Sequence, residues 1–167
     1  MRLVVLALGV LVALATPAPA FEDELLDHLV GEWVMRGQIA GNEIVHDLSV
    51  EWILANHYIQ IKEVSRERNE NGDPEYEALV LIGWDEATEQ YACLWLDVTG
   101  GEGLTNGVIG RASRDGDAIP FVFDMGGDAA IHNTFGFDRE SDQWNWVIDN
   151  VRGGAPSRFA SVTLSRE

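Results

Sequence analysis

Residues 76–98 read YEALVLIGWDEATEQYACLWLDV, and they carry the strongest indication of the fold class. Two runs rich in aliphatic and aromatic residues, 76–84 and 89–98, flank the short polar segment Asp85–Glu89. Two such runs joined by a few turn-forming residues are typical of a β-hairpin. The polar segment is too short to hold a crossover helix, so the two strands should pair antiparallel.

The same pattern extends in both directions from this hairpin. No segment after residue 30 keeps a helical period, and tight-turn dipeptides such as Asn71-Gly72 and Asp115-Gly116 separate the apolar runs. A short helix is expected only over Glu22–Val30, where the leucines share one face. We expect strands near residues 32–40, 43–54, 57–66, 76–84, 89–98, 104–113, 118–125, 129–138, 143–150 and 157–165.

Short connections between consecutive strands predict an up-and-down order. About ten strands in that order can remove their exposed edges by closing into a barrel. The sequence therefore predicts an all-β, up-and-down antiparallel β-barrel of about ten strands with a short N-terminal helix. Residues 21–167 show no linker or low-complexity segment, so they are expected to form a single domain.

The first 20 residues, MRLVVLALGVLVALATPAPA, have the pattern of a secretory signal peptide. Arg2 precedes an apolar stretch, Leu3–Ala15, and Ala18-Pro19-Ala20 fits a cleavage site. The apolar stretch is shorter than the roughly 20 residues of a membrane-spanning helix. We expect cleavage after Ala20 and a periplasmic or secreted protein without a membrane span. An uncleaved anchor is the alternative.

Charge excludes one large class of partners. The chain has 28 Asp and Glu against 11 Lys and Arg, a formal net charge of −17. Such a surface repels phosphate backbones, so we expect no binding of nucleic acid. Cys93 is the only cysteine, which rules out an intramolecular disulfide, and its apolar surroundings predict a small buried side chain.

Several short motifs resemble a known family of barrels. Leu29-Val30-Gly31-Glu32-Trp33 looks like the L-x-G-x-W start of lipocalin-like (calycin) barrels. The rest resembles the bacterial family called domain of unknown function 1579. The matching segments are Glu51–Leu54 with His57–Ile59, Leu81–Asp85, Tyr91–Asp97 and Gly107–Asp117.

The resemblance covers roughly residues 25–166 and implies a lipocalin-like barrel with a calycin-type cavity, in which Trp33 closes one end. The G-x-W motif is also similar to nitrobindin-like haem barrels, which use a histidine near the carboxyl terminus to bind iron. The final strand here, Arg158–Leu164, has no histidine. We therefore expect no haem and no other cofactor.

Alternation along the expected strands predicts which side chains share a face. The set His46, Leu48, Val50 and Trp52 lies on one face of its strand. Equivalent sets are Tyr91, Cys93, Trp95 and Asp97, and Trp144, Trp146 and Ile148. If these faces point inward together, they form an aromatic cavity with a polar tip. The residues predicted to bind a ligand are Trp52, Trp95, Asp97, Trp146, His46 and Glu63.

Catalytic and metal motifs are absent from the sequence. The histidines lack zinc-site spacing, and no serine lies in a G-x-S-x-G motif. Asp97 and His132 would form a general acid/base pair if their strands bring them together. Glu63 invites the same idea, but we expect it to pair with Arg111 or Arg36 in a structural role.

Three functions remain open. The preferred hypothesis is an exported barrel that binds a small apolar or amphipathic molecule in its cavity. The second is a small cofactor-free enzyme that uses inward histidine and carboxylate groups, although no catalytic residue is assigned. The third is a structural or partner-binding domain whose barrel is filled, with apolar outer faces that could form a homodimer.

Overall fold

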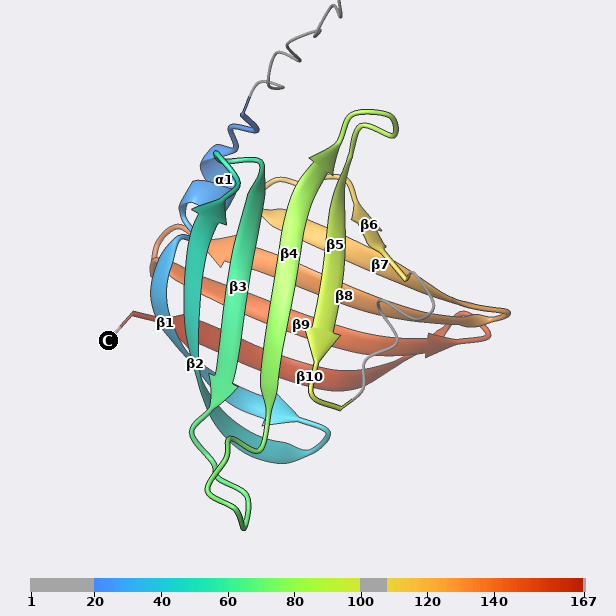
Figure 1. Ribbon diagram of the computed structural model, residues 1–167. Coiled ribbons are helices and arrows are strands. Elements are labelled where there is room, and N and C mark those ends of the chain that lie inside the picture. The colour runs from blue at the N-terminus through green and yellow to red at the C-terminus, as the bar shows by residue number, and fades with distance from the viewer. Residues whose placement is uncertain (1–19, 100–107, 167) are drawn as a thin grey trace, which may run out of the picture.

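A computed structural model describes residues 20–99 and 108–166. In these residues, ten antiparallel strands form one closed barrel in which each strand pairs with its neighbours in sequence, and β1 pairs with β10 (Figure 1). The predicted up-and-down barrel is confirmed. The first 19 residues, which carry most of the predicted signal peptide, lie outside the described part of the chain.

The strand bounds follow the expected runs closely. The first five strands are β1 (Gly31–Ile39), β2 (Asn42–Ile53), β3 (Tyr58–Ser65), β4 (Glu77–Asp85) and β5 (Gln90–Asp97). The other five are β6 (Gly110–Ala112), β7 (Ala118–Gly126), β8 (Ala129–Asp138), β9 (Gln143–Arg152) and β10 (Ala155–Ser165). The sixth strand, expected over 104–113, is short, and residues 104–107 of that prediction lie outside the described residues.

The expected N-terminal helix is shorter than predicted. Helix α1 covers Glu24–Asp27, because the Asp23 carboxylate caps it by accepting hydrogen bonds from the backbone N–H groups of Leu25 and Leu26 at 2.9 and 3.0 Å. His28 already forms its C-terminal cap, and Gly31 begins β1 instead of merely ending the helix. The segment is therefore one helical turn that leads into the barrel.

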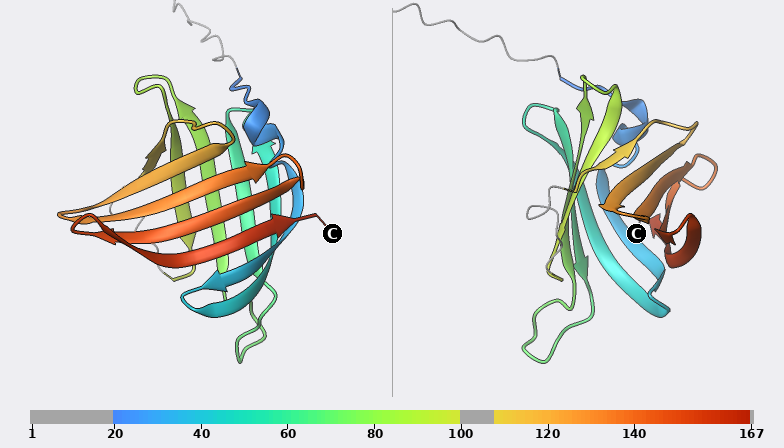
Figure 2. Two further views of the ribbon diagram at one scale, coloured as in Figure 1. Left: turned by 180° about the vertical axis from the view of Figure 1, so that it is seen from behind. Right: turned by 90° about the vertical axis from the view of Figure 1, so that its right-hand side faces the viewer.

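Helix α1 closes one end of the barrel (Figures 1 and 2). Leu25, Leu26 and Leu29 are fully buried there, and the Trp33 indole N–H donates to the Leu29 carbonyl at 2.7 Å. The Arg166 guanidinium lies over the Trp33 ring, 3.9 Å from its centre. Trp33 is thus buried against α1 at this end of the barrel.

The barrel is flattened into two facing layers. Strands β2–β5 run across β7–β10, which lie behind them in Figure 1, and the side view in Figure 2 shows the two layers facing each other. Residues on the inner faces alternate with outward residues along each strand, as in β3, where buried and less buried positions alternate. The candidate site described below lies toward the end of the barrel opposite α1.

Candidate functional site

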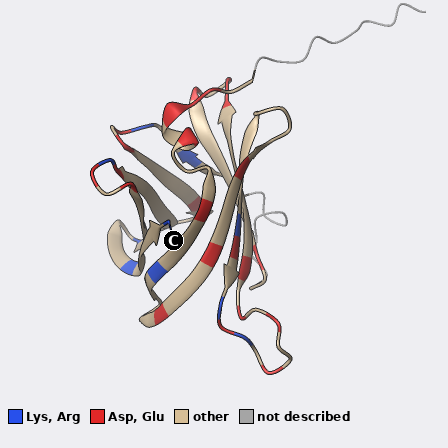
Figure 3. Cartoon of the chain, turned by 90° about the vertical axis from the view of Figure 1, so that its left-hand side faces the viewer, with Lys and Arg blue, Asp and Glu red and all other residues tan. Residues whose placement is uncertain are grey.

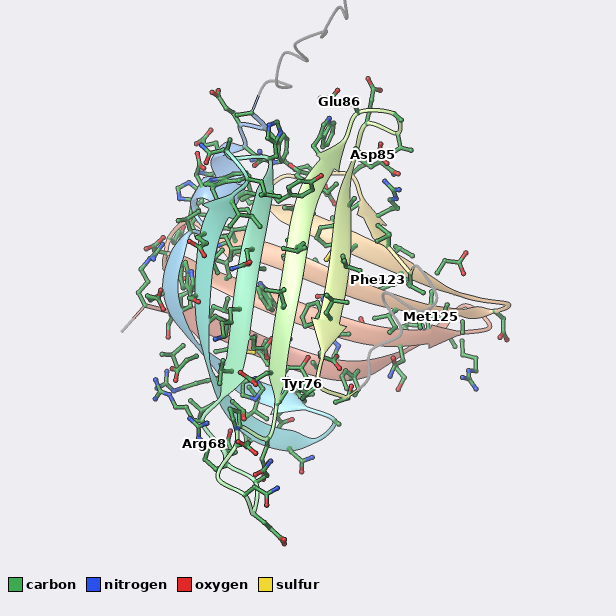
Figure 4. All side chains as sticks on the ribbon, in the orientation of Figure 1. Arg68, Tyr76, Asp85, Glu86, Phe123 and Met125 are labelled. Atoms are coloured by element: carbon green, nitrogen blue, oxygen red, sulfur yellow. The ribbon has the colours of Figure 1, made fainter. Side chains whose placement is uncertain are left out.

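The barrel encloses a cavity of about 660 Å³. Its innermost lining residues are buried, whereas the residues of the mouth, such as Glu43, Glu67 and Met125, are exposed. Figure 4 places Tyr76 and Met125 away from α1, while Asp85 and Glu86 lie at the α1 end. The interior is therefore not packed solid, in contrast to the filled barrel of the third hypothesis. The cavity volume lies within the range typical of small-molecule sites.

Aromatic side chains form much of the cavity wall. The rings of Trp95 on β5 and Trp146 on β9 meet edge to face, with centroids 6.3 Å apart and an interplanar angle of 72°. Trp146 also stacks on Phe135, at 4.3 Å between centroids. The other apolar residues of the lining are Met35, Ile39, Ala40, Ile44, Val108, Phe123, Met125, Ile131, Ile148, Phe159, Ala160 and Val162.

A histidine and a carboxylate meet within this wall. Leu48 on β2 pairs with Glu63 on β3, so His46 is a diagonal neighbour of Glu63 on the inner face. His46 Nδ1 lies 2.5 Å from Glu63 Oε1, and the two residues are only 4% and 2% exposed. The Tyr76 ring stacks on the imidazole, at 5.6 Å between centroids. Glu63 thereby holds the imidazole in place through one of its two carboxylate oxygens.

Three buried side-chain nitrogen and oxygen atoms in the described residues have no hydrogen-bond partner. They are Glu63 Oε2, Asn133 Oδ1 and Trp146 Nε1, and all three residues line the cavity. Asn133 and Trp146 are diagonal neighbours on β8 and β9, because Phe135 pairs with Trp146 and Asn133 with Ile148. A buried polar atom left without a partner costs about 1–3 kcal/mol. Two hydrogen-bond acceptors and one donor are thus left unpaired on side chains of the cavity wall.

A second polar chain lies nearer the mouth. The Trp95 indole N–H donates to the Tyr76 hydroxyl at 3.2 Å, and that hydroxyl donates to Asp97 Oδ2 at 3.4 Å. The other Asp97 oxygen accepts from the Thr99 backbone N–H and hydroxyl at 2.9 and 2.5 Å. Burial and then the charge of Glu63 raise the pKa of Tyr76, so its phenol stays protonated and keeps this chain in one arrangement.

Five of the six residues predicted from the sequence line this single cavity: His46, Glu63, Trp95, Asp97 and Trp146. Whether they bind a ligand stays a prediction.

Trp52, the sixth predicted residue, does not line this cavity. Its indole N–H donates to Asp27 Oδ1 at 2.8 Å, and its ring contacts Phe21, both at the α1 end of the barrel. Trp52 is on the same side of β2 as His46 but six residues along, which corresponds to roughly 20 Å of strand.

The structure does not form two pairings that the sequence suggested, one of them conditional on the strands bringing Asp97 and His132 together. His132 is exposed on β8, whereas Asp97 faces the cavity, so they cannot act as an acid/base pair. Glu63 pairs with His46, while Arg111 instead contacts Asp85 on the outer surface. Burial on the inner face of β3 directs Glu63 away from the exposed arginines.

Sequence reasoning missed two residues of the site. Asn133 lies between Ile131 and Phe135 on the inner face of β8, and a polar residue between two apolar ones at alternating positions was the available signal. Tyr76 precedes β4 and carries no such signal, because its position depends on the β3–β4 connection.

Other sequence predictions concern residues outside the cavity. Cys93 is fully buried, and burial raises the pKa of its thiol, as expected for a packing residue. In the described ranges, no group of three or more His, Cys, Asp or Glu could hold a metal ion. No helix there is long and apolar enough to span a membrane.

The outer surface keeps some apolar groups. Leu54, Tyr58 and Val98 are 70%, 43% and 58% exposed, and a shallow groove lies against the outer face of β3–β5, beside Leu81 and Leu94. The homodimer expected from such faces stays a prediction.

Comparison with known proteins identifies the fold alone. No family model matches the chain, and no curated protein matches its sequence. The crystal structure of Rv2717c from M. tuberculosis is similar to this chain, with a TM-score of 0.55 and 13% sequence identity. The match covers 85% of this chain and 94% of that one. This similarity supports the barrel and carries no information on the ligand.

Proposed function

We propose that the protein is an exported, lipocalin-like barrel that binds one small amphipathic molecule in its cavity. Support for export comes from the signal-peptide pattern of residues 1–20. Support for the lipocalin-like class comes from the L-x-G-x-W resemblance and from a barrel closed at one end by α1 and Trp33.

The unpartnered atoms of Glu63, Asn133 and Trp146 are the observation that carries the proposal. Buried polar groups of a folded protein are nearly always paired. Among the described residues, the side-chain exceptions all belong to residues of one cavity wall, which is otherwise largely apolar and aromatic. A ligand that fills their hydrogen bonds regains part of the free energy that their burial costs.

The arrangement suits a molecule with one polar head and an apolar body. The head would accept from Trp146 Nε1 and donate to Glu63 Oε2 or Asn133 Oδ1. The body would lie against the rings of Trp95 and Phe123 toward the mouth. Burial of its apolar surface would supply most of the affinity, and the head would fix its orientation.

Calorimetric titration of the protein with 1-octanol, an uncharged amphipathic probe, tests this proposal. We expect saturable binding with a Kd below about 1 mM. Trp146→Phe removes one neutral hydrogen bond, so it should weaken binding by about 2- to 10-fold. Trp52→Phe is the matched control, because Trp52 is bound to Asp27 outside the cavity, and it should leave Kd unchanged.

Two results would contradict the proposal. One is that 1-octanol and its charged analogues, octylammonium and octanoate, all fail to bind below about 1 mM. The other is that Trp52→Phe weakens binding while Trp146→Phe does not, which would place the ligand at the other end of the barrel.

The contact between His46 and Glu63 favours a second candidate, which is cofactor-free proton transfer. Glu63 contacts Nδ1, so Nε2 of His46 would act as the base. On a bound ketone, the α C–H bond would break and its proton would move to Nε2. The C–H electron pair would form the carbon–carbon double bond of the enolate, and the π pair of the carbonyl would move onto its oxygen. The Trp146 N–H would stabilise that oxygen.

Exchange of the α-protons of 2-octanone in D₂O, followed by NMR, tests this activity. Wild-type protein should accelerate the exchange, and His46→Gln should abolish the acceleration while 1-octanol still binds. A rate equal to that of free imidazole at the same concentration would contradict this second candidate.

A further inference from the structure

Acidic groups surround the cavity at every depth. Glu63 lies at the inner wall, Asp97 is half-buried further out, and Glu43, Glu67 and Glu75 are exposed at the mouth. In the described part of the chain, no Lys or Arg lines the cavity. Figure 3 shows the same imbalance in one view of the described residues, where acidic residues are spread over strands and loops and basic ones are fewer.

Besides its charge, Glu63 has a buried carboxylate oxygen that lacks a hydrogen-bond partner. Its residue is 2% exposed, its Oε1 contacts His46, and its Oε2 has no partner. A carboxylate oxygen can only accept hydrogen bonds, so the missing partner must be a donor. A cationic donor makes the stronger bond to a carboxylate, because charge assistance roughly doubles the strength of a neutral hydrogen bond.

The rest of the wall is compatible with a positive charge. Trp95 and Trp146 border the same cavity, and indole faces attract cations. Asn133 Oδ1 is a second unfilled acceptor. A carboxylate head would instead meet the carboxylates of the mouth on its way in. Among the described lining residues, it would find no basic side chain except His46, which Glu63 already engages.

We propose that the cavity is selective for amphipathic organic cations, ammonium compounds with an apolar body, whose N–H donates to Glu63 Oε2. This inference rests on the proposed binding function and adds the charge of the ligand to it. Acidic residues at the mouth raise the local concentration of such cations, and Glu63 holds the ammonium group at the inner wall.

Three probes with one octyl chain test the charge preference by calorimetry on the full-length chain: octylammonium, 1-octanol and octanoate. The chain is constant, so differences in Kd report the head alone. We expect octylammonium to bind at least about tenfold more tightly than octanoate, with 1-octanol between them. Rising salt should reduce this preference, because exposed carboxylates contribute to it.

Glu63→Gln tests the assigned residue. It keeps the shape of the side chain and removes its charge, so the preference for octylammonium over octanoate should fall to within about threefold. Glu51→Gln is the matched control, because Glu51 lies on the outer face of β2 and accepts from Gln60 at 3.2 Å. That variant loses the same charge and should keep the wild-type preference.

A double variant covers the case in which Glu63→Gln does not fold. Glu67→Gln with Glu75→Gln changes only exposed groups of the mouth and should lower the preference about two- to threefold at low salt.

Octanoate binding as tightly as octylammonium, or a preference that survives in Glu63→Gln, would overturn the selectivity and leave the binding function standing. An unchanged preference in the double variant would overturn it where Glu63→Gln does not fold. Absence of binding by all three probes would overturn both proposals.

Discussion

Replacing Asn133 by leucine should stabilise the ligand-free protein. Asn133 is 2% exposed and its Oδ1 has no partner, so the side chain burdens the folded state with an unmet acceptor. Removing that cost is worth about 1–3 kcal/mol in the free energy of unfolding. Leucine has nearly the same shape, so the exchange leaves no new cavity in the wall.

The corresponding change in Tm is readily measured. For a domain of this length, about 1 kcal/mol shifts Tm by roughly 2–4 °C, so Asn133→Leu should raise Tm by about 2–12 °C. Urea denaturation at 25 °C should give the same sign with an unchanged slope. The variant should also bind 1-octanol more weakly, because the head loses one polar partner.

Asn145→Leu is the matched control. Asn145 lies on the outer face of β9, and its Oδ1 accepts from the Thr163 hydroxyl at 2.9 Å. Loss of that bond should leave stability unchanged or lower it by about 1 kcal/mol. A fall of more than about 1 kcal/mol in the free energy of unfolding of Asn133→Leu would contradict this prediction, because Asn133 would then have a partner in the folded protein.

Three further predictions concern the scaffold. Cys93 is fully buried and burial raises its pKa, so iodoacetamide should modify it only after unfolding; rapid labelling of the native protein would contradict that burial. Gly37→Ala should lower the free energy of unfolding by more than about 2 kcal/mol, because φ of Gly37 is +147° and a Cβ would lie 2.3 Å from the Ser161 carbonyl oxygen. A Tm within about 2 °C of wild type would be inconsistent with this packing. A hydrogen bond from Arg139 lowers the pKa of Asp117 below its ordinary 3.8. The ionised Asp117 therefore adds stability above pH 3.8, and this stability is lost as the pH falls through the lowered pKa of the folded state. Urea titrations of wild type and Asp117→Asn should therefore differ near pH 6 and converge in acid, and a constant difference would contradict the assignment.

The fold was largely predictable because its information is local. The hairpin at 76–98 appears as β4 and β5, and the short connections determine the antiparallel order of the whole barrel. Alternation also identified the inner face of β2, β5 and β9, since successive side chains of a strand must point to opposite sides.

The site was predictable only in part. A pattern along one strand determines which face of the sheet a side chain occupies, but it does not determine how far along the barrel the side chain lies. Trp52 shares a face with His46 yet lies at the closed end. The contact of Glu63 with His46 depends on the register between β2 and β3, and Tyr76 reaches the site only through the β3–β4 connection. Such relations arise from pairing between strands, which no single strand encodes.

The indole N–H signals in a ¹⁵N–¹H correlation spectrum report at which end of the barrel a ligand binds. Trp146 Nε1 is unpartnered at the cavity wall, whereas Trp33 Nε1 is bound to the Leu29 carbonyl and Trp52 Nε1 to Asp27 at the closed end. On titration with octylammonium or 1-octanol, the Trp146 signal should move progressively to saturation, and those of Trp33 and Trp52 should stay in place. A Trp146 signal that does not move while Trp33 or Trp52 shifts, or no shift in any of the three at saturating probe, would contradict binding at this cavity.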